Sequence, residues 1–261
     1  MQHSDMGSDA IAVARRLVAS NERVLVLTGA GISTDSGIRD FRGPDGVWTR
    51  DPRAERMSTL ENYLSSAEVR RQSWRSIIAS GALGAEPNGA HLALAELGRR
   101  KALSLLVTQN TDGLHLDAGH DPERVIEIHG SSRCTRCIRC GSTVPTRNVV
   151  ERVRLGEDDP GCLELRPQGP CGGILKRTTI LFGESLVSAD LRRAEAYARG
   201  CDLLLAVGST LSVYPAAGLA TLAHRAGAPV VIVNGSPTDQ DDLATALVRG
   251  AIGEILPAIV A

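Results

Sequence analysis

Short runs of consecutive apolar residues recur along the chain. They cover residues 24–28, 103–107, 125–128, 203–207 and 230–233. The runs are continuous rather than alternating, which is typical of strands in a parallel sheet whose two faces are both covered by helices. Between several runs, apolar residues recur at helical spacing, at about residues 8–18, 88–100, 188–200 and 215–227. This alternation of strands and helices predicts an α/β fold with a doubly wound, Rossmann-like parallel sheet.

Two segments interrupt the alternation. Residues 41–87 are loop-rich and then helical, and residues 131–178 contain five of the six cysteines. Because both lie between strand units, we interpret them as insertions that form a smaller lobe. The expected organisation is a single domain over residues 1–261. Its large lobe comprises approximately residues 8–40, 101–130 and 179–261, and its small lobe comprises a helical part at about 41–100 and a cysteine-rich part at about 131–178.

The composition narrows the classes of function. The chain has 261 residues, a net charge of −1 and only 3% aromatic residues. A nearly neutral chain with few aromatics argues against nucleic acid as a partner. Neutralising phosphates requires many Lys and Arg residues, and stacking on bases requires aromatic residues. No segment reaches the roughly 18 apolar residues of a membrane helix, and no signal peptide is recognisable. We expect a cytoplasmic protein without a membrane partner, whose cysteines are metal ligands or core residues.

Small and polar residues follow every predicted strand. The five segments are Gly29-Ala30-Gly31-Ile32-Ser33, Gln109-Asn110-Thr111-Asp112, His129-Gly130, Gly208-Ser209-Thr210 and Asn234-Gly235-Ser236. Ligands of open parallel sheets bind beyond the carboxyl ends of the strands, so five such ends predict a nucleotide-sized ligand. Gly29 and Gly31 would let the backbone approach a pyrophosphate at a helix N-terminus, although a tight turn needs the same residues. Asn234 is a better candidate for the adenine ribose than Asp51, because no strand precedes Asp51.

Five motifs make the sequence resemble the sirtuin family. They are GAGISTDSGIRDFRG at 29–43, TQNTDG at 108–113, EIHG at 127–130, FGE at 182–184 and GSTLSVYPAA at 208–217. The resemblance extends from about residue 20 to residue 256 and is greatest to bacterial, actinobacterial-looking members. It implies an NAD-dependent protein lysine deacetylase, which cleaves NAD to nicotinamide and transfers the acetyl group of N6-acetyl-lysine to ADP-ribose. Acetylated proteins or peptides would be its partners.

The resemblance also implies a role for individual residues. The pyrophosphate and nicotinamide side of NAD would be lined by Gly29, Ala30, Gly31, Ser33, Asp40, Phe41 and Arg42. The nicotinamide ribose and carboxamide would be held by Gln109, Asn110 and Asp112, and the adenosine half by Gly208, Ser209 and Asn234. The substrate peptide would add as an extra strand between two edges, Phe182, Gly183 and Glu184 on one side and Ser212 and Val213 on the other.

His129 would be the general base, with Asn110 as a second catalytic residue. A neutral imidazole suits this step, because its unperturbed pKa of about 6.5 leaves it basic and unprotonated at neutral pH. A positioned base of this kind typically contributes about 10²–10⁴-fold to the rate. The other histidines, His3, His91, His115, His120 and His224, are interpreted as core or solvated.

The cysteines predict one structural zinc ion. Cys134, Cys137 and Cys140 form two overlapping C-x-x-C pairs, and Cys162 and Cys171 follow downstream. The resemblance selects Cys137, Cys140, Cys162 and Cys171 as the ligands, with residues 163–170 as an insertion between the last two. Four thiolates leave no open coordination position, which makes the metal structural rather than catalytic. Cys134 is either a substitute ligand or a spare thiol.

Other functions use the same pocket. A mono-ADP-ribosyltransferase and a long-chain deacylase are the alternatives among enzymes, and an NAD sensor without activity is the alternative among binding proteins. Sirtuins that prefer acidic acyl groups have a Tyr-x-x-Arg pair, whereas Tyr63 is followed by Ser66 at that spacing. Arg39 stands where the family usually has proline, so the loop could be more mobile or Arg39 could reach a phosphate.

Overall fold

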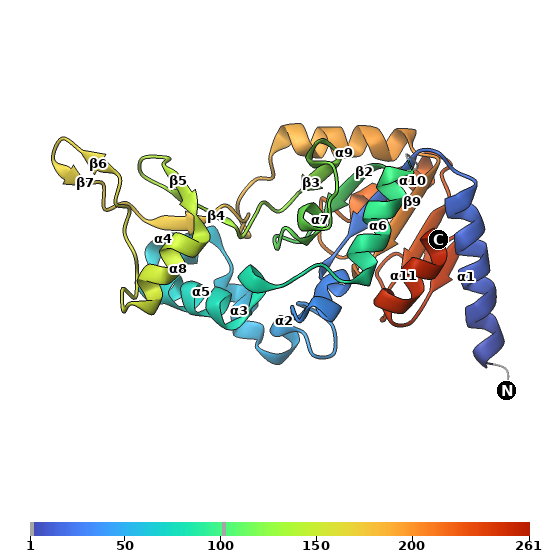
Figure 1. Ribbon diagram of the computed structural model, residues 1–261, viewed down its shortest axis with the longest axis horizontal. Helices are drawn as coiled ribbons and strands as arrows, with labels where there is room; N and C mark the ends of the chain where they lie inside the picture. The colour runs from blue at the N-terminus through green and yellow to red at the C-terminus, as the bar shows by residue number, and fades with distance from the viewer. Residues whose placement is uncertain (1–2, 101–102) are drawn as a thin grey trace.

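A parallel sheet forms the centre of the large lobe. The computed structural model describes residues 3–100 and 103–261, and Figure 1 shows the large lobe on the right. Within these residues the sheet has six strands in the order β11-β10-β9-β1-β2-β3, all parallel to their neighbours. The strands are β1 (Val24–Thr28), β2 (Leu103–Thr108), β3 (Val125–Glu127), β9 (Leu203–Val207), β10 (Val230–Val233) and β11 (Ala246–Val248). The predicted Rossmann-like fold is therefore confirmed.

Helices cover both faces of this sheet. On one face lie α1 (His3–Ala19), α6 (Gly89–Arg99) and α11 (Ile252–Val260), and on the other lie α9 (Ser188–Gly200) and α10 (Gly218–Arg225). Val24 and Val26 of β1 belong to the first core, whereas Leu25 and Leu27 belong to the second. Successive strand side chains point to opposite faces, and both faces are buried here, which explains why the strand sequences are continuously apolar.

The two insertions form the small lobe, on the left in Figure 1. The helical insertion contains α2 (Val47–Arg50), α3 (Pro52–Met57), α4 (Leu60–Ser65) and α5 (Ala67–Ala79). The cysteine-rich insertion contains a three-stranded antiparallel sheet of β4 (Cys134–Cys137), β5 (Thr143–Pro145) and β8 (Leu175–Arg177), together with α8 (Thr146–Arg154). Between Cys162 and Cys171, β6 (Leu165–Arg166) and β7 (Gly169–Pro170) form a hairpin that projects from the end of the lobe.

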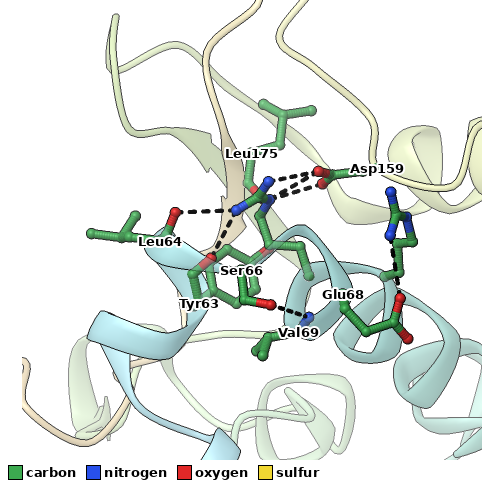
Figure 2. Close-up of polar contacts among 9 residues, drawn as sticks. Tyr63, Leu64, Ser66, Glu68, Val69, Asp159 and Leu175 are labelled. Atoms are coloured by element: carbon green, nitrogen blue, oxygen red, sulfur yellow. Dashed lines mark hydrogen bonds and ion pairs between the residues drawn. The ribbon is translucent and has the colours of Figure 1, made fainter.

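A shared core and a polar joint connect the two insertions. Trp74 and Ile77 of α5 are buried together with cysteines and valines of the other insertion. Beside this core, Figure 2 shows Tyr63 and Asp159 in a polar cluster. The guanidinium of Arg70 donates to both carboxylate oxygens of Asp159 and to the last carbonyls of α4, and the Tyr63 hydroxyl donates to the Leu175 carbonyl at 2.7 Å. The two insertions therefore pack as one unit.

The boundaries of the lobes differ from the prediction in one place. The helical part of the small lobe was expected to extend over residues 41–100, yet α6 packs on the large lobe through Ala90, Leu94 and Leu97. The reason is that the apolar face of α6 is buried against α11 and β2, while the helical insertion ends before it. The boundary predicted at residue 101 lies outside the described residues. Among the described residues, no helix has the length and hydrophobicity needed to cross a membrane.

Candidate active site

The carboxyl ends of five neighbouring strands lie along one edge of the sheet. Hydrogen bonds connect the first loop residues to the adjacent strand: Gly29 N–H donates to Val207 O at 3.0 Å, and Gln109 N–H donates to Thr28 O at 2.9 Å. In the same way, Ile128 bonds to Thr108, and Gly208 to Val233. The structure thus brings together the five polar segments that the sequence predicts as a ligand site.

Glycines allow two of these loops to touch through their backbones. The loop after β1 continues as the 3-10 helix η1 (Ala30–Ser36), and Gly31 N–H donates to Gly208 O at 2.8 Å. A Cβ atom at Gly29 would lie 2.7 Å from Gly208 O, and one at Gly31 would lie 2.9 Å from Gly208 Cα. Both positions therefore exclude a side chain because of the neighbouring backbone. At the start of η1, the N–H of Ala30 has no hydrogen-bond partner among the described residues and can bind an anion.

Three buried polar side chains form a network beside this loop. Asn110 Nδ2 donates to Gly29 O at 3.2 Å and to Ser33 Oγ at 3.0 Å, and Ser33 Oγ donates to Asp112 Oδ2 at 2.8 Å. The second carboxylate oxygen of Asp112 accepts the N–H of Leu114, at the start of α7 (Leu114–Asp117). Because each group has a partner, the three side chains are held in fixed orientations despite their burial.

His129 is oriented as a base. Its Nδ1 lies 3.1 Å from the carbonyl oxygen of Gln109. A carbonyl can only accept, so Nδ1 carries the proton and Nε2 keeps its lone pair. Burial lowers the pKa of His129, and the hydrogen bond to Gln109 opposes this only in part. The imidazole is therefore neutral at neutral pH, with Nε2 available to take up a proton.

The residues predicted for the adenosine half lie on the other side of β1. Gln109 Nε2 donates to Ser209 Oγ at 2.8 Å, so the β2 and β9 loops are joined across β1. Ser209 and Asn234 are both buried. Asn234 Nδ2 donates to Ser236 O at 2.8 Å, which closes the loop after β10.

The segment after η1 is held by its own side chains. Asp40 Oδ1 accepts the N–H of Gly43 at 3.1 Å, and Arg42 forms an ion pair with Glu55 at 2.7 Å. The Arg42 guanidinium also lies 4.5 Å from the ring centre of Trp48. The Asp40 carboxylate and the Arg42 guanidinium thus both have partners within residues 40–55. Arg39 is exposed and forms no ion pair among the described residues.

Trp48 lies beside the predicted site, although the sequence did not predict it there. Its ring centre lies 4.5 Å from that of Phe41 and 5.7 Å from that of Phe182, so it joins the segment after η1 to the predicted peptide edge. Asn88 was also missed. Its side chain caps α6 and donates to Ile32 O at 2.8 Å, which fixes η1. The signals were present, since Trp48 is one of two tryptophans and Asn88 opens a predicted helix.

The predicted peptide edge is partly occupied by the protein itself. Phe182 N–H donates to Ser58 O, and Phe182 O accepts the N–H of Leu60, both at 3.0 Å. The Glu184 carboxylate pairs with the buried Lys176 at 2.8 Å. Of the three FGE residues, Gly183 alone has a backbone N–H and carbonyl without partners in the described chain. On the opposite side, the Ser212 hydroxyl bonds to Thr210, and Val213 O accepts the N–H of Ala217.

Tyr63 is a structural residue. It is buried, and its hydroxyl bonds to the cysteine-rich insertion in the joint shown in Figure 2. Burial also raises the pKa of its phenol, so the hydroxyl stays protonated. Ser66 caps α5 by accepting the N–H of Val69. Both side chains are thus bonded within the small lobe.

The four predicted zinc ligands converge. The sulfur atoms of Cys137, Cys140, Cys162 and Cys171 all lie within 4.8 Å of one another. Two of the distances are 3.8 Å, between Cys137 and Cys171, and 3.7 Å, between Cys140 and Cys162. Four sulfurs at about 2.3 Å from a zinc ion form a tetrahedron with edges of about 3.8 Å, so the group fits this metal. Cys134 is exposed and lies outside the group, which excludes it as a substitute ligand.

Comparison with known proteins decides the family. The sequence matches the Sir2 family over residues 29–215. The chain belongs to the Sir2, or sirtuin, family. A Streptomyces coelicolor protein named NAD-dependent protein deacetylase 2 is 48% identical over 90% of this chain and 95% of its own. A Bradyrhizobium diazoefficiens protein named NAD-dependent protein deacetylase 1 is 40% identical over 92% of this chain and 91% of its own.

Solved sirtuin structures share the whole fold. A Sir2 enzyme structure that is 38% identical superposes with a TM-score of 0.86 and covers 97% of both chains. A Sir2 complex with deacetylated p53 peptide and 3′-O-acetyl-ADP-ribose is 31% identical, with a TM-score of 0.87 over 95% of this chain and 96% of that chain. A Sir2 complex with p53 peptide and NAD is 32% identical, with a TM-score of 0.80 over 92% and 93% of the two chains.

Proposed function

We propose that this sirtuin is an NAD-dependent protein lysine deacetylase. It would cleave NAD to nicotinamide and transfer the acetyl group of N6-acetyl-lysine to ADP-ribose. The observation that carries the proposal is the neutral His129, whose Nε2 is free at the same sheet edge as the buried network of Ser33, Asn110 and Asp112. The names of the relatives and the Sir2 complexes with p53 peptide, NAD and 3′-O-acetyl-ADP-ribose support it.

The residues divide the work between binding and proton transfer. NAD, when bound, supplies the ADP-ribosyl group that accepts the acetyl group. Ala30 N–H would bind the pyrophosphate, and Asn110 and Asp112 would orient the nicotinamide ribose. Nε2 of His129 would withdraw a proton from a ribose hydroxyl, because a neutral imidazole with a lowered pKa remains unprotonated there. Ser209 and Asn234 would hold the adenosine half.

The peptide would bind through main-chain hydrogen bonds at Gly183. Its unpartnered N–H and carbonyl offer one site for an added strand, and Val213 would face the peptide from the other side. Binding of this kind depends on backbone more than on side chains, so it accepts many acetylated proteins. Phe182, which is 40% exposed, would contribute its ring rather than its backbone.

Zinc would stabilise the small lobe without taking part in the reaction. The four thiolates fill a tetrahedral site completely, so no position remains for substrate or water. We also propose a cytoplasmic location, which is supported by the lack of a disulfide among the six cysteines of the described chain. The net charge of −1 supports protein rather than nucleic acid or membrane surface as the partner.

Nicotinamide release tests the function directly. The purified protein should release nicotinamide from NAD only when an acetyl-lysine peptide is present, and the acetyl group should appear on ADP-ribose in equal amount. If label from NAD instead remained on protein, the enzyme would be a mono-ADP-ribosyltransferase. Preferential turnover of a myristoyl-lysine peptide would identify a long-chain deacylase. Absence of both turnover and NAD binding would refute the proposal.

A further inference from the structure

Arg133 connects the zinc-binding insertion to the loop after β2. It lies between His129 and the first strand of the insertion, β4. Its Nε donates to the backbone carbonyl of Asp112 at 2.7 Å. Its two terminal nitrogens form a bidentate pair with the Asp117 carboxylate, with Nη1 2.6 Å from Oδ1. The planar guanidinium therefore spans from the loop to the end of α7.

This contact completes the fixation of Asp112. The two carboxylate oxygens of Asp112 accept from Ser33 and Leu114, and its backbone oxygen accepts from Arg133. The adjacent Gly113 has a left-handed φ of 77°, and a Cβ atom there would collide with the Arg133 guanidinium. Glycine thus allows the arginine to cross the loop.

A second contact comes from the neighbouring residue. Ser132 N–H donates to Thr111 O at 2.7 Å, and the Ser132 and Thr111 hydroxyls are also 2.7 Å apart. Residues 110–113 are therefore held from two sides. Ser33 holds them from the large lobe, and residues 132 and 133 hold them from the segment that enters the small lobe.

The energetics favour a positional role over a purely stabilising one. The side chains of Arg133 and Asp117 are 38% and 39% exposed. Because both side chains remain in contact with solvent, the pair contributes on the order of 1 kcal/mol to stability even with its bidentate geometry. The hydrogen bond to Asp112, in contrast, acts on a residue that is 8% exposed and belongs to the network beside His129. Arg133 thus affects the geometry of the loop more than the stability of the fold.

We propose that Arg133 is a positioning residue that fixes residues 110–113 before NAD binds. The inference rests on the proposed function, in which Asn110 and Asp112 orient the nicotinamide ribose. Without Arg133, the loop must be ordered during binding, and that ordering lowers affinity. Once NAD is bound, the same contacts form, so the chemical step is little affected.

The test separates KM from kcat. Arg133→Gln should raise KM for NAD about tenfold, leave kcat within about twofold, and leave KM for the acetyl-lysine peptide unchanged. Arg147→Gln is the matched control, because Arg147 is exposed on α8 of the same insertion and forms no ion pair among the described residues. It should behave as wild type. The Tm values of both variants without NAD should agree within about 2 °C.

A double variant tests the coupling. Asp117→Ala should raise KM for NAD in the same way. Combining it with Arg133→Gln should add little, because both variants remove the same contact, the one between Arg133 and Asp117. The proposal is overturned if Arg133→Gln has the KM of the Arg147 control, if kcat falls while KM is unchanged, or if the double variant shows the full product of the two effects. Wild type that neither binds NAD nor turns over would refute the proposed function instead.

Discussion

Because three histidines are buried, we expect the free energy of unfolding to decrease at acidic pH. His91, His115 and His120 lie in a row, with ring centres 4.9 Å and 5.4 Å apart. Nε2 of His115 is hydrogen-bonded to the hydroxyl of Thr28 at the end of β1, so the histidines lie next to the loop that begins at Gly29. Burial lowers the pKa of all three, and that of His120 to about 4, with neighbouring His91 and Arg99 adding to the effect.

The size of the effect follows from His120. Its folded pKa lies below the unfolded value of about 6.5, so the unfolded chain binds the proton more readily. The stability that the folded chain gains from keeping His120 neutral is therefore fully present above about pH 6.5 and is lost as the pH falls toward 4. One pKa unit corresponds to about 1.4 kcal/mol, which gives a loss of about 2 kcal/mol between pH 7 and pH 5.

Urea denaturation at the two pH values measures this loss. His120→Gln removes the titrating group and keeps a polar side chain. Between pH 7 and pH 5, the free energy of unfolding should therefore decrease less for this variant than for wild type, by about 2 kcal/mol. His224→Gln, at an exposed position on α10, is the matched control for the substitution itself. Parallel pH profiles for wild type and His120→Gln would contradict the reasoning.

Three further predictions concern the site and the metal centre, and two of them have a matched control variant. His129→Ala should lower deacetylation by about 10²–10⁴-fold with an unchanged Tm, and near wild-type turnover would remove His129 as the base. Cys162→Ser should abolish zinc binding in metal analysis and unfold the small lobe, whereas Cys134→Ser should retain one zinc per chain; equal metal content in both would refute the ligand set. Gly31→Ala should lower the free energy of unfolding by about 1–3 kcal/mol in urea, because its Cβ meets Gly208, while Gly84→Ala, whose Cβ would meet open space, should cost less than about 0.5 kcal/mol.

The sheet could be predicted because burial on both faces leaves a direct record in the sequence. Every strand with a continuous apolar run was found, as in β9 and β10. β11 was missed because its apolar segment covers only residues 246–248, whereas the segment that predicted β3 covers four residues, 125–128. The lobe to which α6 belongs was also missed, since an apolar helix face does not reveal which surface covers it.

The candidate site was predictable as a set of loops but not as a set of contacts. Strand ends place Asn110, His129 and Ser209 at one edge, since parallel strands end together. The partners of Arg42 and Glu184 could not be predicted, because an ion pair between distant residues leaves no local pattern. Glu55 and Lys176 become their partners only when the chain folds.

The β6 and β7 hairpin offers a place to modify this enzyme. It lies between two metal ligands, yet it projects into solvent and carries the exposed Leu165 at its base. Lengthening a loop whose ends are already fixed costs little entropy. A fluorophore or affinity tag inserted between Pro167 and Gln168 would therefore report on the small lobe while keeping Arg166, whose side chain bonds to the Cys140 sulfur, in its place.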